Sequence, residues 1–150
     1  MDTNSEKRLA LVHPKLAQLV RQIAANVGFE IRAVQGLRTW AEQDMLYAQG
    51  RTRIGPKLTN ARGGYSNHNF GLAVDLCPFK GGKPQWNDNA GFTQIGNTAT
   101  RLGLEWGGGW ARFPDRPHIQ LRGIPTLAEC RALYKQGGLV KVWSKVKERG

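Results

Sequence analysis

Apolar residues recur every three or four positions in parts of the N-terminal half, which is the spacing of one buried helix face. Residues 14–27 show this pattern, with a proline in the first turn and Gly28 as a stop signal, and they predict a helix. Thr39 and Glu42 form a T-x-x-E capping box, which predicts a second, short helix that ends at Gly50.

The C-terminal half repeats the helical pattern. Residues 92–102, closed by a glycine, predict one helix, and a second capping box at Thr126 and Glu129 predicts another that runs through Tyr134. After a Gly-Gly pair, residues 139–146 predict a last, basic helix. Its apolar stripe consists of Leu139, Val142, Trp143 and Val146.

Four short segments predict strands, and the first two show the alternation of apolar and polar residues that a half-buried strand requires. These segments are residues 29–34, 72–77, 104–106 and 118–121. Residues 51–67 and 78–89 are expected to be connections, and the first is long enough to suggest a binding role. Strands mixed with helices, without regular βαβ alternation, predict an α+β fold. We find no repeat and no linker, so residues 1–150 are expected to form a single domain.

The chain has 150 residues, of which 40% are hydrophobic, enough for one packed core. Its net charge is +11 and its pI about 10.3, which predicts a polyanionic partner. Nucleic acid, anionic lipid and the carboxylate-rich bacterial cell wall all meet this description. Cys77 and Cys130 are too few for a disulfide framework and have no CxxC spacing.

The chain has no apolar run of the roughly 18 residues that a membrane span needs. Its first 30 residues carry charges throughout, so they contain no signal-peptide core. We therefore expect a soluble protein that is made in the cytoplasm.

Two of the three histidines lie near carboxylates and turn residues. His68 precedes Asp75, and Asp115 precedes His118 by three positions. Two imidazoles and one carboxylate are what a catalytic zinc binds, with a fourth position left for water. We predict His68, Asp75 and His118 as metal ligands, and Asp115 as the general base. The spacing is not H-E-x-x-H, so the protein is not a zincin.

These clusters belong to an ordered series of motifs. The series is Ser66-x-His68-x-x-Gly71-x-Ala73-x-Asp75, then Trp106-Gly107-Gly108, then Asp115-x-x-His118. It is preceded by Val12-His13-Pro14-x-Leu16 and by Gly36-x-Arg38-Thr39-x-x-x-Gln43. In this series, which covers most of its length, the chain resembles the VanY/D-Ala-D-Ala carboxypeptidase family of zinc peptidases (peptidase family M15). It resembles in particular the L-alanyl-D-glutamate endopeptidase branch, which includes phage endolysins and bacterial cell-wall hydrolases.

The resemblance implies a compact α+β domain with a small antiparallel sheet flanked by helices, of the hedgehog/DD-peptidase type. It implies one Zn²⁺ on the predicted triad, Asp115 as catalytic acid and base, Arg38 near the scissile carbonyl and substrate contacts from Ser66. The implied activity is hydrolysis of the L-Ala–D-Glu bond of the peptidoglycan stem peptide. A monomeric phage endolysin without a wall-binding module, made in the host cytoplasm and acting in the periplasm or cell wall, fits this description.

Other interpretations stay open from the sequence. A D,D-carboxypeptidase or dipeptidase of the same fold is the nearest, and a non-haem iron oxygenase also uses two histidines and a carboxylate. A basic nucleic-acid- or wall-binding module without catalysis is the alternative of a different class, although no nucleic-acid-binding motif is present. Arg38 is alternatively a salt-bridge partner of Glu42, and Asp115 a turn residue, in which case Glu105 is the next candidate base.

The excess charge has two interpretations of its own. From Arg131 onward six cations face one acid, a balance of +5 that includes Glu148 and Arg149. Either the last helix packs on the domain and its lysines are only solvated, or it acts with the basic 51–62 loop. In the second case the two segments would hold the protein on an anionic wall or lipid surface.

Overall fold

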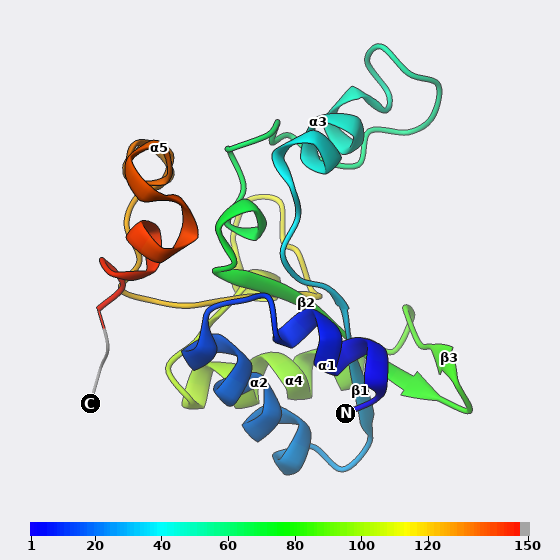
Figure 1. The fold of residues 1–150 in the computed structure, drawn as a ribbon. Helices are drawn as coiled ribbons and strands as arrows, with labels where there is room; N and C mark the ends of the chain where they lie inside the picture. Colours follow the sequence, from blue (N-terminus) through cyan, green and yellow to red (C-terminus); the bar gives the residue numbers. More distant parts are fainter. Residues whose placement is uncertain (148–150) are drawn as a thin grey trace.

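Four strands form the main path of an antiparallel sheet in the computed structural model, which describes residues 1–147 (Figure 1). Their order is β1 (Glu30–Gln35), β2 (Ala73–Lys80), β5 (His118–Gln120) and β4 (Glu105–Trp106). A short strand, β3 (Lys83–Pro84), pairs with the far end of β2. The central pair, β2 and β5, therefore has a neighbouring strand on each side, and it carries two of the predicted site residues, Asp75 and His118.

Helices flank this antiparallel sheet on both sides, and the mixture of helices with a small antiparallel sheet confirms the predicted α+β class. They are α1 (Thr3–Leu9), α2 (Pro14–Asn26), α3 (Trp40–Ala48), α4 (Asn89–Arg101) and α5 (Leu127–Trp143), with 3-10 turns η1 (Asn67–Phe70) and η2 (Gly107–Gly109). Figure 1 shows α1, α2 and α4 gathered on one side of the sheet and α3 and α5 on the other. In the part of the chain that the structure describes, no helix is long and apolar enough to cross a membrane.

The N-terminal helix α1 was not predicted, because its short, polar sequence has too few apolar positions to show a period. Its role is to cover the outer edge of β1. Ser5 Oγ accepts a hydrogen bond of 2.9 Å from Ala33 N, and Arg8 Nη1 donates one of 3.1 Å to Ala33 O. Both groups would otherwise be unpaired at a sheet edge, where they invite association with another chain.

Strand β2 is longer than predicted. The assignment of Pro78 to a connection is wrong: it lies in β2, opposite Ile31 of β1. Proline has no N–H to donate, but its carbonyl accepts a hydrogen bond from Gln85 N at 2.8 Å. Helix α4 also begins three residues earlier than predicted, because Asp88 caps it by accepting a hydrogen bond from Gly91 N.

The C-terminal helical region is broken at Gly137 and Gly138, as the sequence predicts. Gly138 has a φ of 68°, which favours glycine, and the second segment ends at Trp143 rather than at residue 146. Val142 is fully buried, and Trp143 Nε1 donates a hydrogen bond of 2.7 Å to Phe70 O. The apolar stripe therefore packs on the domain. The two charged residues Glu148 and Arg149 lie outside the described residues.

A β-bulge in β1 prepares the site. The register pairs Ala33 with Leu76 and then Gln35 with Asp75, so that Val34 is the extra residue. A bulge bends its strand and redirects the side chains that follow. Here the bulge lies just before the segment that carries Arg38, and it pairs Gln35 with Asp75 of the central strand β2.

Candidate metal centre and active site

The β2–β5 pairing brings two predicted ligands together. Asp75 lies directly opposite His118 in the antiparallel register, and Asp75 Oδ1 is 3.7 Å from His118 Nδ1. Side chains opposite each other on two strands point to the same face of the sheet. The strand pairing thus brings together two residues that are separated by 42 residues of intervening chain.

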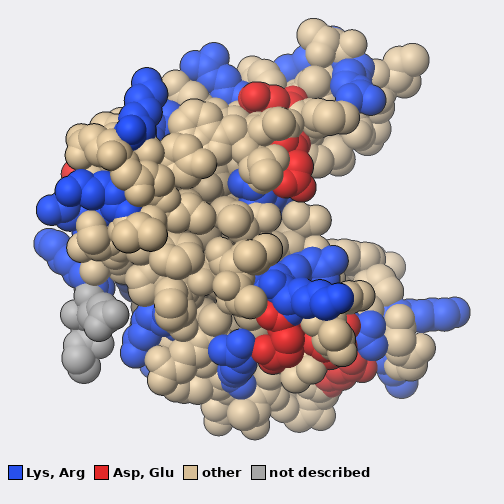
Figure 2. All heavy atoms as spheres, viewed as in Figure 1, with Lys and Arg blue, Asp and Glu red and all other residues tan. Residues whose placement is uncertain are grey.

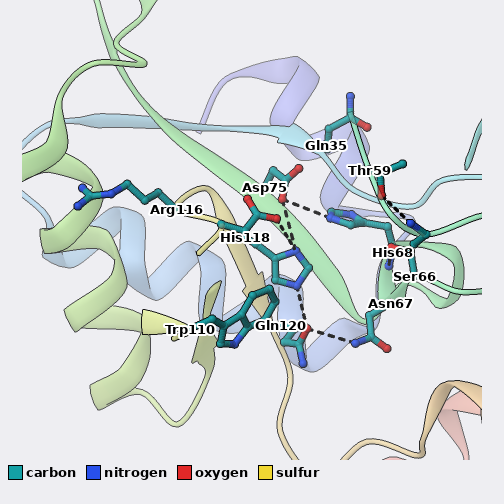
Figure 3. Close-up of polar contacts among 12 residues, drawn as sticks. Gln35, Thr59, Ser66, Asn67, His68, Asp75, Trp110, Arg116, His118 and Gln120 are labelled. Atoms are coloured by element: carbon teal, nitrogen blue, oxygen red, sulfur yellow. Dashed lines mark hydrogen bonds and ion pairs between the residues drawn. The ribbon is translucent and has the colours of Figure 1, made fainter. Parts of the chain in front are cut away.

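His68 comes from the 3-10 turn η1, which stands immediately before β2. Ser66 caps this turn by accepting a hydrogen bond from His68 N at 3.2 Å, and Gly71 ends it in the left-handed conformation with φ of 67°. A Cβ at Gly71 would lie 2.9 Å from the Trp143 ring. The tight turn places His68 Nε2 3.2 Å from Asp75 Oδ1, so all three predicted ligands meet (Figure 3).

Hydrogen bonds on the far sides of the two rings select the atoms that face the centre. His68 Nδ1 donates to Gly36 O at 2.9 Å, and His118 Nε2 donates to Gln120 Oε1 at 2.8 Å. The unprotonated nitrogens are then Nε2 of His68 and Nδ1 of His118, both directed at Asp75. Such bonds from the opposite ring nitrogen are the usual support of a metal-bound histidine.

The donor set fits a zinc ion. One atom from each ligand, His68, Asp75 and His118, lies within 4.8 Å of the other two. Asp75 Oδ1 is buried and accepts no hydrogen bond, an arrangement that costs free energy unless a cation is bound there. Two imidazole nitrogens and one carboxylate oxygen are a set that catalytic zinc uses.

Charges around the cluster shift the ligands' proton affinities in the direction that metal binding requires. Burial alone would raise the pKa of Asp75, but His68, His118 and Arg38 hold it below its ordinary value. Burial is the main cause that lowers the pKa of His118, and repulsion from His68 adds to it whenever His68 is protonated. Both groups therefore favour the deprotonated form, which is the form that binds a metal.

Asp115 lies beside the cluster but outside it. Its Oδ2 is 3.8 Å from His118 Nδ1, and its side chain is 49% exposed, against 16% for Asp75. Asp115 N donates to Gly107 O, and a Cβ at Gly107 would lie 2.5 Å from Asp115 O. The absence of a side chain at Gly107 thus allows the backbone of Asp115 to lie close to it. Burial and the negative charge of Asp75 raise the pKa of Asp115, which suits a group that both accepts and returns a proton.

Arg38 contacts the cluster through Asp75 rather than forming the alternative pair with Glu42. Its Nη2 lies 3.3 Å from Asp75 Oδ2, while Nε donates to Gln35 and Nη1 to Gln43. Glu42 instead completes the capping box with Thr39, as its spacing predicts. Arg38 therefore holds the second carboxylate oxygen, which leaves Oδ1 directed toward the two histidines.

Sequence reasoning missed the groups that support His118. Gln120 Oε1 accepts from His118 and also from Asn67 Nδ2 at 3.2 Å, and Gln120 Nε2 donates to Glu105 Oε2 at 3.5 Å. The same Glu105 oxygen accepts from Trp110 Nε1 at 3.0 Å. Glu105 thus supports His118 indirectly. The available signal was the spacing of two between His118 and Gln120 on one strand, which places both on one face.

The cluster opens into a cleft of about 370 Å³. One wall comes from the segment after α3, including Leu58 and Tyr65, and the other includes Trp110 and Asp115; Arg38 and Ser66 also line the cleft. Figure 2 shows the surface hollowed between the arm formed by α3 with its following loop and the body that holds the sheet. A larger hollow near Gly123 contains no metal-ligating cluster among residues 1–147.

Comparisons with known proteins agree with this combination of fold and site, which is that of a metallopeptidase. Residues 59–121 match a family model described as D-alanyl-D-alanine carboxypeptidase. The chain is 39% identical to the peptidoglycan L-alanyl-D-glutamate endopeptidase CwlK of Bacillus subtilis (strain 168), with 73% of each chain covered. It is 32% identical to the L-alanyl-D-glutamate peptidase of Escherichia phage T5, over 69% of this chain and 72% of the relative.

A solved structure gives the same result in three dimensions. The crystal structure of the L-Ala D-Glu endopeptidase ChiX of Serratia marcescens matches with a TM-score of 0.63 and 28% identity, over 81% of this chain and 88% of that one. The chain therefore belongs to peptidase family M15, in its L-alanyl-D-glutamate peptidase branch.

Proposed function

We propose that this protein is a zinc-dependent peptidoglycan endopeptidase of the endolysin type that hydrolyses the L-Ala–D-Glu bond of the stem peptide. The observation that carries the proposal is that His68, Asp75 and His118 lie together. The carboxylate oxygen at the middle of this cluster, Asp75 Oδ1, is buried and accepts no hydrogen bond. The relatives named for this activity support the choice of bond.

In this proposal His68, Asp75 and His118 hold one zinc ion. When bound, zinc would act as a Lewis acid, which polarises a peptide carbonyl and lowers the pKa of water. Gly36 and Gln120 fix the two imidazole orientations, and Arg38 fixes the carboxylate. The chain's own contribution to the centre is thus a set of ligands that needs little rearrangement to bind the ion.

Asp115 is the proposed proton carrier. Its half-exposed carboxylate accepts a proton from the attacking water and passes it to the amine of the leaving D-Glu. Arg38 places a positive charge in the cleft, close to where the carbonyl oxygen becomes negative. Ser66 lines the same cleft and is proposed to contact substrate, although its hydroxyl also caps η1.

All of these residues come from one chain, so we take the monomer as the active unit and residues 1–150 as one peptidase domain that acts on the bacterial cell wall.

Metal removal tests the proposal. Chelated protein should lose its ability to clear purified peptidoglycan, and about one equivalent of zinc should restore it. His118→Ala should bind no zinc and stay inactive. Full activity of chelated protein, shown free of metal by elemental analysis, would contradict the proposal.

We propose in addition that the basic surface tethers the protein to an anionic wall or lipid surface. Figure 2 shows Lys and Arg side chains along the edge formed by α5 and on the arm. Exposed charges are screened beyond about 8 Å at physiological salt. Sedimentation with purified wall should therefore weaken as salt rises, and in a variant with Lys141, Lys145 and Lys147 changed to Gln. Binding that is unchanged by both salt and the three substitutions would contradict the tether, and the C-terminal helical region would then have only a packing role.

A further inference from the structure

Two guanidinium groups lie over one aromatic ring at the wall of the cleft. Tyr65 lines the cleft, and the Cζ atoms of Arg62 and Arg131 are 4.6 Å and 3.8 Å from its ring centroid. Arg62 and Tyr65 belong to the segment after α3, whereas Arg131 comes from α5. The cluster therefore joins two parts of the fold that are far apart in sequence.

Neither cation is neutralised. Arg62 Nη2 donates to Tyr65 Oη at 3.1 Å and Arg131 Nη1 donates to Gly64 O at 3.1 Å, but within residues 1–147 neither forms an ion pair with a carboxylate. The acid whose charge acts on Arg62 is Asp44, and its Oδ1 is occupied by Gly63 N. Among residues 1–147 the arginines that pair with carboxylates are Arg21, Arg32 and Arg38, so what distinguishes Arg62 and Arg131 is their shared contact with Tyr65.

The contacts hold the two cations in place before a ligand arrives. Contact with the Tyr65 ring and one hydrogen bond each restrain the two guanidinium groups, and each group keeps further N–H donors for a ligand. Planar guanidinium forks match the two oxygens of a carboxylate. The positive surroundings, with the Arg62 hydrogen bond first among the causes, also lower the pKa of the Tyr65 phenol.

We propose that Arg62 and Arg131, held on Tyr65, form a subsite that binds a carboxylate of an acidic peptide lying in the cleft. The inference rests on the proposed function, and it adds a specificity element to that function. Tyr65 and Ser66 line the same cleft as His68, and the two arginines lie against the Tyr65 ring next to that lining, so a peptide in the cleft can reach them at this ring. Two unpaired cations beside Tyr65 would select a substrate that carries a negative charge where it passes that ring.

The first test uses Arg62→Gln, because Arg62 is exposed and its loss removes no buried contact. Arg53→Gln is the matched control, since Arg53 is an exposed arginine on the same arm, and the structure gives it no contact with Tyr65. Charged hydrogen bonds are each worth about 1.5–3 kcal/mol, which is about tenfold or more in affinity. Arg62→Gln should therefore raise KM for an acidic stem peptide about tenfold with kcat nearly unchanged, while Arg53→Gln leaves both parameters unchanged.

The second test changes the ligand. Stem peptides amidated at the D-Glu carboxylate, or at the carboxylate of the third residue, are compared with the free acid. The KM penalty of Arg62→Gln should vanish on one of the two amidated peptides, which identifies the carboxylate that is bound. The same penalty on all three peptides, or no penalty on any, would overturn the proposal.

Arg131→Lys provides a second variant, which keeps the positive charge but loses the planar guanidinium group, and it should also raise KM for the free acid.

The subsite can be tested even if the L-Ala–D-Glu bond is not the one cleaved. Calorimetric binding of the free-acid peptide to Asp115→Asn protein should weaken about tenfold on adding Arg62→Gln. Equal binding by the two proteins would overturn the subsite and leave the proposed activity untouched.

Discussion

His118 and Asp75 face each other across the β2–β5 pair, and their side chains meet on one face of the sheet. The next residue of β5 on that face, Gln120, accepts a hydrogen bond from the far nitrogen of His118. Glu105 lies opposite Gln120 on β4 and accepts a bond from its amide. The strand register therefore positions one proposed ligand and also the two groups that orient it.

The first prediction concerns Gln120. Gln120→Leu removes the acceptor that keeps the proton on His118 Nε2, so Nδ1 is no longer reliably free to bind a metal. Loss of such a supporting bond typically lowers metal affinity by about 10–100-fold. Competition with a chromophoric zinc chelator measures the change. Gln94→Leu, at an exposed position on α4, is the control. Equal zinc affinities in the two variants would contradict a role of Gln120 in supporting His118.

The second prediction separates the proton carrier from the ligands. Asp115→Asn should keep zinc and thermal stability but lower turnover by about 10²–10⁴, the usual range for losing a general acid–base group. Asp88→Asn is a matched control, because Asp88 only caps α4 and asparagine caps equally well. A near-native rate for Asp115→Asn would make Asp115 a turn residue and Glu105 the next group to test.

The third prediction follows from the buried thiol of Cys130. Burial raises its pKa to about 11, so at pH 8 only about one thousandth of it is thiolate, the reactive form. Alkylation of the folded protein at pH 8 should be slow at Cys130 and should speed up as pH rises toward 11 or when the protein is unfolded. Mass spectrometry of alkylated peptides measures the rates. Rapid labelling of the folded protein at pH 8 would contradict the buried setting.

The clustering of His68, Asp75 and His118, the proposed metal ligands, could be expected from sequence because each carries its own local signal. His68 and His118 stand beside turn-forming residues, and Asp75 lies on an alternating strand. The supporting groups could not, because their roles depend on pairing between distant strands. Arg38 shows the difference most clearly, since its neighbour in sequence is Glu42 and its partner in space is Asp75. Likewise, α1 is specified by the edge of β1 that it covers, and its own sequence shows no such pattern.

The bond that is cut is the most direct test of the account. Purified peptidoglycan is digested with zinc-loaded protein and, in parallel, with chelated protein, and the released fragments are identified by mass spectrometry with N-terminal labelling. The account predicts fragments with a new N-terminal D-Glu and a free L-Ala carboxylate, in the zinc-loaded digest only. Release of free D-Ala, or the same fragments after complete removal of metal, would contradict it.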